Sequence, residues 1–293
     1  TPFGLERGAA AVTTFRWDVC EPEGLRRKVH FAQVHPRFKH LEPPWPAEVG
    51  DLTQVTIYCN NLTGVAHQVP ELRLRMLALR PSLVFLQEVW DHSVMPDWLP
   101  RSMKAICGSV VGPGTGLVIA WSRSLQGTAA EPTVVLDDRH VLAITVPTKS
   151  HGLLLLVCVH IHPKLSHAGQ TSVLRAIANV EGMAKPDLTI LAGDFNMSPE
   201  ADGPLRYATS KQGILRSFRP VFPIGTKTNF TFRQGQSAAT SIDHIYIKGP
   251  VSDVEGLILP AYSTHSALYA TATPSTAKPD PFAWKLFRWA MCT

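Results

Sequence analysis

The sequence is poor in cysteine and in charge, and it contains no long apolar run. Its five cysteines, at positions 20, 59, 107, 158 and 292, form no CxxC pair, which argues against a disulfide framework and against a zinc ribbon. Charged residues make up only 17% of the 293 residues and hydrophobic residues 45%, which excludes a disordered chain and a coiled coil. The longest apolar run, residues 153–159, is far shorter than the roughly 20 residues of a membrane span, so we expect no membrane partner.

Signals for secretion and for nucleotide binding are also missing. No signal peptide opens the sequence, and the cysteine pattern is typical of a reducing compartment, so we expect an intracellular protein, nuclear or cytoplasmic. The glycines at 112–116 lack the lysine and the following helix of a P-loop, and they predict a turn. The net charge of +5 permits an anionic partner such as nucleic acid without requiring one.

The chain divides into three parts. Residues 1–50 are rich in proline and weakly periodic, which predicts a weakly structured lead-in segment. Residues 51–273 have regular patterns and predict the main domain. Residues 274–293 predict a proline-rich linker and the start of a following region, and the sequence opens without a methionine. We therefore expect a segment of a longer protein.

Strands outnumber helices in the main domain. Helical spacing of apolar residues predicts only two helices, over 70–80 and 169–185. Short apolar runs bounded by glycine, proline or charge predict strands at 55–59, 83–86, 117–121, 133–136, 141–146, 153–160, 188–192, 241–247 and 268–273. This balance favours a two-sheet α/β sandwich over a Rossmann fold.

The Gly193-Asp194-Phe195-Asn196 segment is the strongest chemical signal in the sequence. A buried strand runs into it, and strand alternation would place Asp194 and Asn196 on the same side. A carboxylate can accept a proton from water, and an amide beside it can donate a hydrogen bond to a phosphate oxygen. The alternative is an ordinary turn, because Asp and Asn favour turns in any protein.

Two further strand ends carry polar side chains. Glu88 follows the apolar strand at 83–86, where its oxygens could bind a hard divalent cation. Asn61 follows the strand at 55–59 and precedes Gly64. The alternatives are a solvent-exposed glutamate and a simple turn.

Histidine supplies the remaining candidates. A histidine oriented by a carboxylate can donate to a phosphate or to a developing oxyanion, and Asp243 and His265 are such a pair. Zinc binding by His160, His162 and His167 is a competing hypothesis, because strand alternation places both histidines of a His-x-His segment on the same face.

Taken in order, these elements resemble the endonuclease/exonuclease/phosphatase superfamily, the fold of DNase I and the AP endonucleases, over about residues 52–273. The matching positions are Asn61 in the strand-Asn-x-x-Gly element, Glu88 in Leu-Gln-Glu-Val, Asp194 and Asn196 in Gly-Asp-x-Asn, Asp243 in Ile-Asp-His, and His265 in the last His element. The resemblance implies a four-layer α/β/β/α sandwich of two mainly antiparallel sheets.

The resemblance also implies phosphodiester hydrolysis. Glu88, helped by Asn61, would hold Mg²⁺, with Mn²⁺ as an alternative, and Asp194 would activate the attacking water. Asn196 and His265 would donate hydrogen bonds to the phosphate oxygens, and Asp243 would orient His265. His160 would contact the phosphate or protonate the leaving group.

One position departs from the family pattern. The family usually has Ser-Asp-His at the last element, whereas this chain has Ser263-Thr264-His265. Thr264 removes a negative charge, so weaker metal binding or a less well oriented His265 is expected. A catalytically degenerate copy that only binds nucleic acid is therefore one alternative.

Within the superfamily, the chain looks most like the endonuclease domain of a non-LTR retrotransposon polyprotein. Asn229-Phe-Thr-Phe232 followed by Ser241-Ile-Asp243 is similar to the Tyr-Thr-Phe and Arg-Ile-Asp-Tyr stretches of those enzymes, although Ser241 replaces the usual Arg. Such an enzyme would nick DNA to prime reverse transcription, with RNA as an alternative partner. A cellular deadenylase or a phosphoinositide or sphingolipid phosphatase of the same fold is the other possibility. Aromatic candidates for base stacking are Trp90, Trp98 and Phe232.

Overall fold

The computed structural model describes the strands β1 (Thr14–Asp18) and β2 (Lys28–Ala32) and then residues 54–275, except 66–67, 94, 111, 127–129, 223–230, 233–239, 260 and 262. Strands β1 and β2 pair antiparallel in a small sheet of their own. Most of the predicted lead-in at 1–50 and nearly all of the predicted linker at 274–293 lie outside the described residues.

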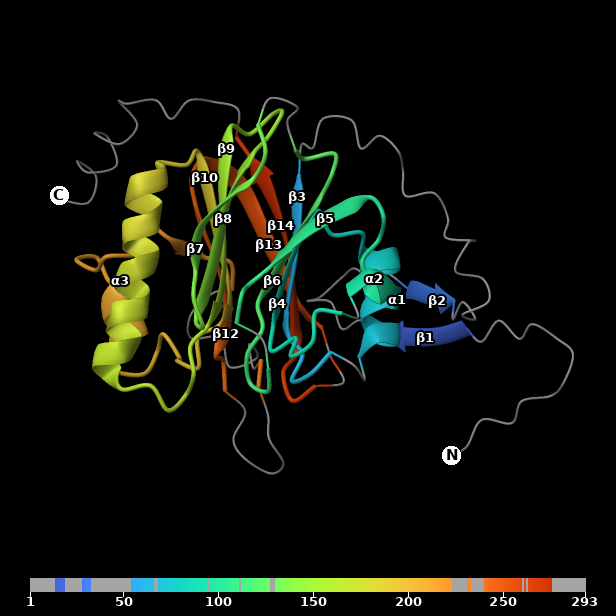
Figure 1. Cartoon of the computed structure of the whole chain (residues 1–293), viewed down its shortest axis with the longest axis horizontal. Coiled ribbons are helices and arrows are strands. Elements are labelled where there is room, and N and C mark those ends of the chain that lie inside the picture. Colours follow the sequence, from blue (N-terminus) through green and yellow to red (C-terminus); the bar gives the residue numbers. More distant parts are fainter. Residues whose placement is uncertain are drawn as a thin grey trace, which may run out of the picture.

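The main domain is built on two six-stranded sheets (Figure 1). The first has the order β11-β12-β10-β9-β8-β7. Its strands are β7 (Thr133–Asp137), β8 (Val141–Pro147), β9 (Leu153–His160), β10 (Leu188–Asp194), β11 (Arg219–Pro220) and β12 (Asp243–Lys248). The second has the order β13-β14-β3-β4-β6-β5. Its strands are β3 (Val55–Asn61), β4 (Leu83–Gln87), β5 (Met103–Cys107), β6 (Val118–Ser122), β13 (Val251–Leu259) and β14 (Ala267–Pro274).

Each sheet is antiparallel except for one parallel pair, β9 with β10 and β3 with β4. A parallel pair needs a crossover connection, and a helix supplies it in both sheets. Helix α3 (His167–Ala184) connects β9 to β10, and α1 (Val69–Leu79) connects β3 to β4. In Figure 1, α3 lies outside the first sheet and α1 lies outside the second. The expected α/β/β/α sandwich of mainly antiparallel sheets is therefore confirmed.

The two connecting helices begin and end where their sequences favour it. The Ser166 hydroxyl at the start of α3 accepts a hydrogen bond from the Gly169 amide, which caps the first turn. Pro70 lies in the first turn of α1, where the missing N–H costs nothing. Both helices lie within two residues of the predicted ranges. Two short helices, α2 (Met95–Trp98) and α4 (Pro204–Thr209), were not predicted.

Alternating side chains of the two sheets form the central core. Residues such as Ile57, Phe85, Ile119, Leu156 and Ile190 are fully buried between the sheets. The outer faces of the sheets contribute two further apolar clusters, which include residues of α3 and α1. Strands that are buried on both faces read as continuous apolar runs, and this is why β4, β9 and β10 were predictable.

Within the main domain, the sequence patterns missed β5, β11 and β13. The two-residue β11 is an edge strand of the first sheet, β5 and β13 are the edge strands of the second, and β13 has exposed polar residues along its first half. An edge strand packs against fewer neighbours and keeps more polar residues, so its apolar pattern is weak. Cys59 and Cys158 are buried free thiols, as expected. Across the described part of the chain, no helix has the length and hydropathy needed to span a membrane.

Candidate active site

The polar strand ends of both sheets meet at one edge of the sandwich. In the first sheet, Asp194 at the end of β10 pairs in register with His160 on β9 and with Asp243 on β12. In the second sheet, Asn61 at the end of β3 pairs with Gln87 at the end of β4, and Glu88 follows directly. The register thus brings residues that are far apart in sequence to the same edge.

Gly193 is the residue that allows Asp194 to take this position. Its φ of 151° is a conformation that side-chain-bearing residues rarely adopt. A Cβ at this position would lie 2.0 Å from the carbonyl oxygen of Val159 on β9. Only glycine permits this close approach of β10 to β9, which sets the carboxylate beside His160.

Asp194 and Asn196 are neighbours through a turn rather than through strand alternation. Strand β10 ends at Asp194, and Asn196 has a left-handed φ of 50°. The Asn196 backbone N–H donates to Asp194 Oδ1 at 2.8 Å, and its side-chain Nδ2 donates to Asp194 Oδ2 at 3.2 Å. The strand-period argument was wrong, because the strand has already ended. Asp194 and Asn196 do lie side by side, as expected, but a turn places them there, as the alternative interpretation proposed.

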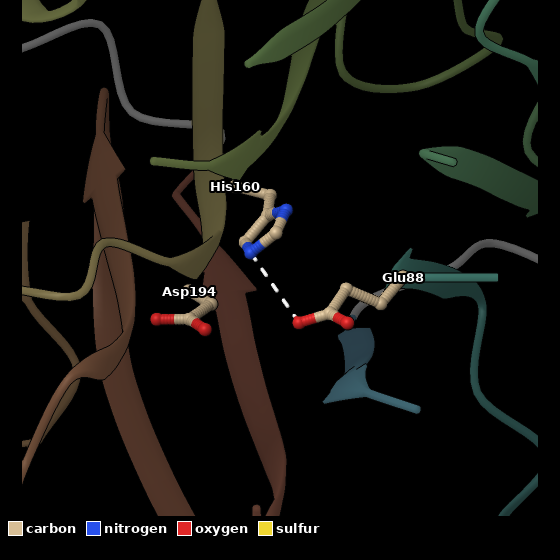
Figure 2. Close-up of side chains that lie close together, drawn as sticks. All are labelled: Glu88, His160 and Asp194. Carbon is tan, nitrogen blue, oxygen red and sulfur yellow. Dashed lines mark ion pairs between the residues drawn. The ribbon is translucent and has the colours of Figure 1, made fainter. Parts of the chain in front are cut away.

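Glu88 reaches this group from the opposite sheet (Figure 2). It lies just past β4 with a left-handed φ of 51°. Its Oε1 is 3.4 Å from His160 Nε2 and accepts a hydrogen bond from Asn61 Nδ2 at 2.9 Å. Its Oε2 accepts a hydrogen bond from the Trp90 indole at 3.2 Å. A positive φ at a non-glycine residue is strained, and such strain clusters at functional sites.

Asn61 bridges the carboxylates of the two sheets. Its Nδ2 donates to Glu88 Oε1 and to Asp194 Oδ2, both at 2.9 Å. Its Oδ1 accepts the backbone N–H of Thr63 at 3.0 Å, which defines the orientation of the amide. In this arrangement Asn61 is a donor that holds the two carboxylates together.

His265 and Asp243 form the expected pair. Nδ1 of His265 lies 3.1 and 3.0 Å from the two Asp243 oxygens, and its Nε2 lies 3.8 Å from Asp194 Oδ2. Burial is the largest single influence and acts to lower the pKa of His265, but the carboxylates of Asp243, Asp194 and Glu88 together raise it to about 9, with Asp243 contributing most. The Phe232 ring packs on the imidazole with centroids 4.7 Å apart. His265 is therefore held as a cation with Nε2 directed toward Asp194.

The electrostatics of this group favour a bound cation. Burial, together with the charge of Asp243, raises the pKa of Asp194 to about 8. Burial lowers the pKa of His160 to about 4, so this imidazole is neutral and able to bind a metal. Ligand atoms of Glu88, His160 and Asp194 lie within 4.8 Å of one another, as do those of Asp194, Asp243 and His265. A divalent cation would relieve the cost of burying the carboxylates, so the residues fit the metal that the resemblance implies.

The zinc hypothesis receives no support. Among the described residues, two groups of side chains have metal-binding spacing. One of them includes His160, and neither includes His162 or His167. His162 Nδ1 instead accepts the backbone N–H of Lys164 at 3.2 Å.

All seven predicted site residues come together, and several supporting residues were not anticipated. The Thr231 hydroxyl accepts the backbone N–H groups of Ile242 and Asp243, which holds the start of β12. The Ser263 hydroxyl donates to the Asn61 carbonyl at 3.0 Å. No spacing rule signals such contacts between distant segments. Of the stacking candidates, Trp98 is 1% exposed and belongs to the core, whereas Trp90 is 37% exposed.

Comparisons with known proteins agree with this geometry. The model of the Endonuclease/Exonuclease/phosphatase family matches residues 59–275. A search of curated protein sequences gave no match. Among solved structures, TDP2 of D. rerio complexed with single strand DNA product superimposes with a TM-score of 0.59 at 17% identity, covering 75% of this chain and 98% of that chain.

Two other structures are similarly close. The endonuclease domain of TRAS1, a telomere-specific non-LTR retrotransposon, has a TM-score of 0.55 at 15% identity, covering 75% of this chain and 98% of that chain. An AP endonuclease from Archaeoglobus fulgidus has a TM-score of 0.58 at 13% identity, covering 74% of this chain and 98% of that chain. At these identities the likeness establishes the fold, and the family match covers most of the chain. This chain belongs to the endonuclease/exonuclease/phosphatase family.

Proposed function

We propose that this protein is a divalent-metal-dependent phosphodiester hydrolase that nicks DNA. The proposal depends on one observation above all. Side chains from both sheets form one connected group of hydrogen bonds and ion pairs, in which Asn61 links the pair Glu88 and His160 to the set Asp194, His265 and Asp243. Membership of a family of hydrolytic nucleases and phosphodiesterases supports the same chemistry.

The metal side of the site is assigned to Glu88, with His160 and Asp194 as the other available ligands. A bound Mg²⁺, or Mn²⁺ in its place, would neutralise the phosphate and stabilise the leaving oxygen. Asn61 keeps the two carboxylates in place through its Nδ2.

The proton-transfer side of the site is assigned to Asp194 and His265. Asp194 orients the attacking water and accepts its proton, once the bound cation favours the ionised form of this buried carboxyl. Protonated His265 and the Asn196 amide donate to the non-bridging oxygens as charge builds up in the transition state. Asp243 holds the tautomer and angle of His265. His160, as a neutral imidazole, is assigned to the metal or to a phosphate contact.

DNA is the substrate we propose, and a retrotransposon endonuclease is the biological role. The solved D. rerio TDP2 contains single-strand DNA product, and TRAS1 is a retrotransposon endonuclease domain, so both neighbours act in a DNA context. Aromatic surface at Trp90 and Phe232 lies beside the catalytic group and suits base stacking. We extend the proposal to a catalytic domain at 51–273 within a longer polyprotein of the nucleus or cytoplasm.

A plasmid-nicking assay tests this function. Supercoiled plasmid is incubated with the protein in Mg²⁺ or in EDTA, and nicked circles are expected only with the metal. Asp194→Asn and His265→Ala should abolish nicking. The matched control is Asp253→Asn, because Asp253 is exposed on β13 and pairs with Thr273 near the far end of β14.

Other outcomes decide against the proposal. Metal-independent nicking, or nicking retained in Asp194→Asn, would contradict the mechanism. Release of AMP from poly(A) with intact plasmid would identify a deadenylase. Hydrolysis of phosphoinositide or sphingolipid substrates alone would identify a lipid phosphodiesterase. DNA binding without turnover would identify a degenerate copy.

A further inference from the structure

Trp90 has an unusual environment for a tryptophan of this protein. Its side chain is 37% exposed, whereas Trp98 and Trp121 are 1% and 2% exposed in the core. Its indole Nε1 donates to Glu88 Oε2 at 3.2 Å. The ring thus lies at the surface with its polar edge bonded to the carboxylate that the proposed function assigns to the metal.

The backbone around Trp90 is fixed by two neighbouring turns. Trp90 has a left-handed φ of 60°, and its N–H donates to the Thr115 carbonyl at 3.2 Å. A Cβ on Gly116 would lie 3.0 Å from the Trp90 nitrogen, so glycine is needed in that turn. A Cβ on Gly64 would lie 2.9 Å from Trp90 Cε3. Glycine at both positions lets the turns pack closely against this residue, which limits the movement of its ring.

The two oxygens of Glu88 are therefore held from different directions. Oε1 contacts Asn61 and His160, which belong to the inner part of the site. Oε2 accepts a hydrogen bond from Trp90 and from no other group in the described part of the chain. Without the indole N–H, the carboxylate could rotate about its last side-chain torsion, which is broad in glutamate. Groups that hold metal ligands in place commonly change metal affinity 10- to 100-fold.

We propose that Trp90 is a positioning residue for the metal-binding carboxylate of Glu88, and that its indole N–H, rather than its bulk, carries this role. The inference rests on the proposed function, because it requires that Glu88 bind the cation. It differs from the base-stacking role, which would use the ring face and would need no N–H.

Two substitutions separate the N–H from the ring. Trp90→Phe keeps an aromatic ring and removes the donor. Trp90→Gln removes the ring but keeps an amide N–H at the same number of bonds from Cβ as the indole N–H. Trp98→Phe is the matched control, because Trp98 Nε1 has no hydrogen-bond partner among the described residues. Glu88→Gln serves as the reference for loss of the metal ligand.

The main measurement is the dissociation constant for Mg²⁺ by isothermal titration calorimetry without substrate, with thermal denaturation of each variant as a check of folding. Trp90→Phe should raise this constant about tenfold. Trp90→Gln and Trp98→Phe should stay close to the parent protein.

Each result has a distinct meaning. Weak binding in Trp90→Gln with normal binding in Trp90→Phe would overturn the inference and assign a packing role to the ring. Normal binding in both Trp90 variants, with weak binding in Glu88→Gln, would also overturn it while leaving the proposed function intact. Normal binding in Glu88→Gln would instead overturn the metal assignment of the proposed function itself.

Discussion

Replacing Asp243 by asparagine tests the electrostatic core of the site most directly. Asp243 is 3% exposed, and both of its oxygens lie within about 3 Å of His265 Nδ1. Asparagine keeps the size of the side chain and an oxygen acceptor but removes the charge. Burial acts to lower the pKa of His265, and the Asp243 charge is the main reason that it stands at about 9 instead of 6.5.

The magnitude follows from this difference. A rise of the His265 pKa from 6.5 to about 9 corresponds to about 3 kcal/mol of preferential stabilisation of the imidazolium. Because the folded-state pKa lies above the unfolded value, this stabilisation is fully present below pH 6.5 and is lost as the pH rises through about 9. Asp243→Asn should therefore lower the free energy of unfolding by up to about 3 kcal/mol near pH 6 and by much less near pH 10.

Two measurements check this prediction. NMR titration of histidine ring signals in EDTA should place the pKa of His265 near 9 in the parent protein and at or below its ordinary value in Asp243→Asn. Urea denaturation of both proteins at the two ends of the pH range should show the converging stabilities. A parent His265 that titrates near 6.5, or a pKa that Asp243→Asn leaves unchanged, would refute the reasoning.

Three further predictions concern the backbone, the thiols and the departure from the family pattern. Gly193→Ala should destabilise the protein by more than about 3 kcal/mol in urea denaturation, because its Cβ would meet the neighbouring backbone. Gly182→Ala, in open space on α3, should instead stabilise it by about 0.5–1 kcal/mol. Because burial raises the pKa of Cys158 to about 12 and that of Cys59 well above its ordinary value, iodoacetamide near pH 8 should label both only after denaturation, as measured by peptide mass spectrometry. Thr264→Asp restores the carboxylate usual in the family and should lower the Mg²⁺ dissociation constant measured by calorimetry about tenfold. An unchanged constant would show that the exposed Thr264 position lies too far from the cation to matter.

Local sequence was sufficient for the elements that are buried on both faces. Strands β4, β9 and β10 read as continuous apolar runs, and α1 and α3 have helical spacing with suitable first-turn residues. Strands β9 and β10 end at His160 and Asp194, and Glu88 directly follows β4, so these candidate site residues were recognisable as polar side chains at strand ends. These features depend on near neighbours in the chain, and a sequence records near neighbours directly.

Only the tertiary structure decided how those residues act together. Strand register set Asp194 between His160 and Asp243, and the packing of one sheet on the other brought Glu88 and Asn61 to them. The pKa shifts arise from that burial and crowding of charge, and the contact from Trp90 to Glu88 depends on turns at Gly64 and Gly116. Edge strands β5 and β13 were missed for a related reason. Each pairs with a neighbouring strand on one side only, so its sequence keeps more polar residues and its apolar pattern is weak. Distances between segments far apart in the chain follow from the packing of the whole fold, which no local pattern contains.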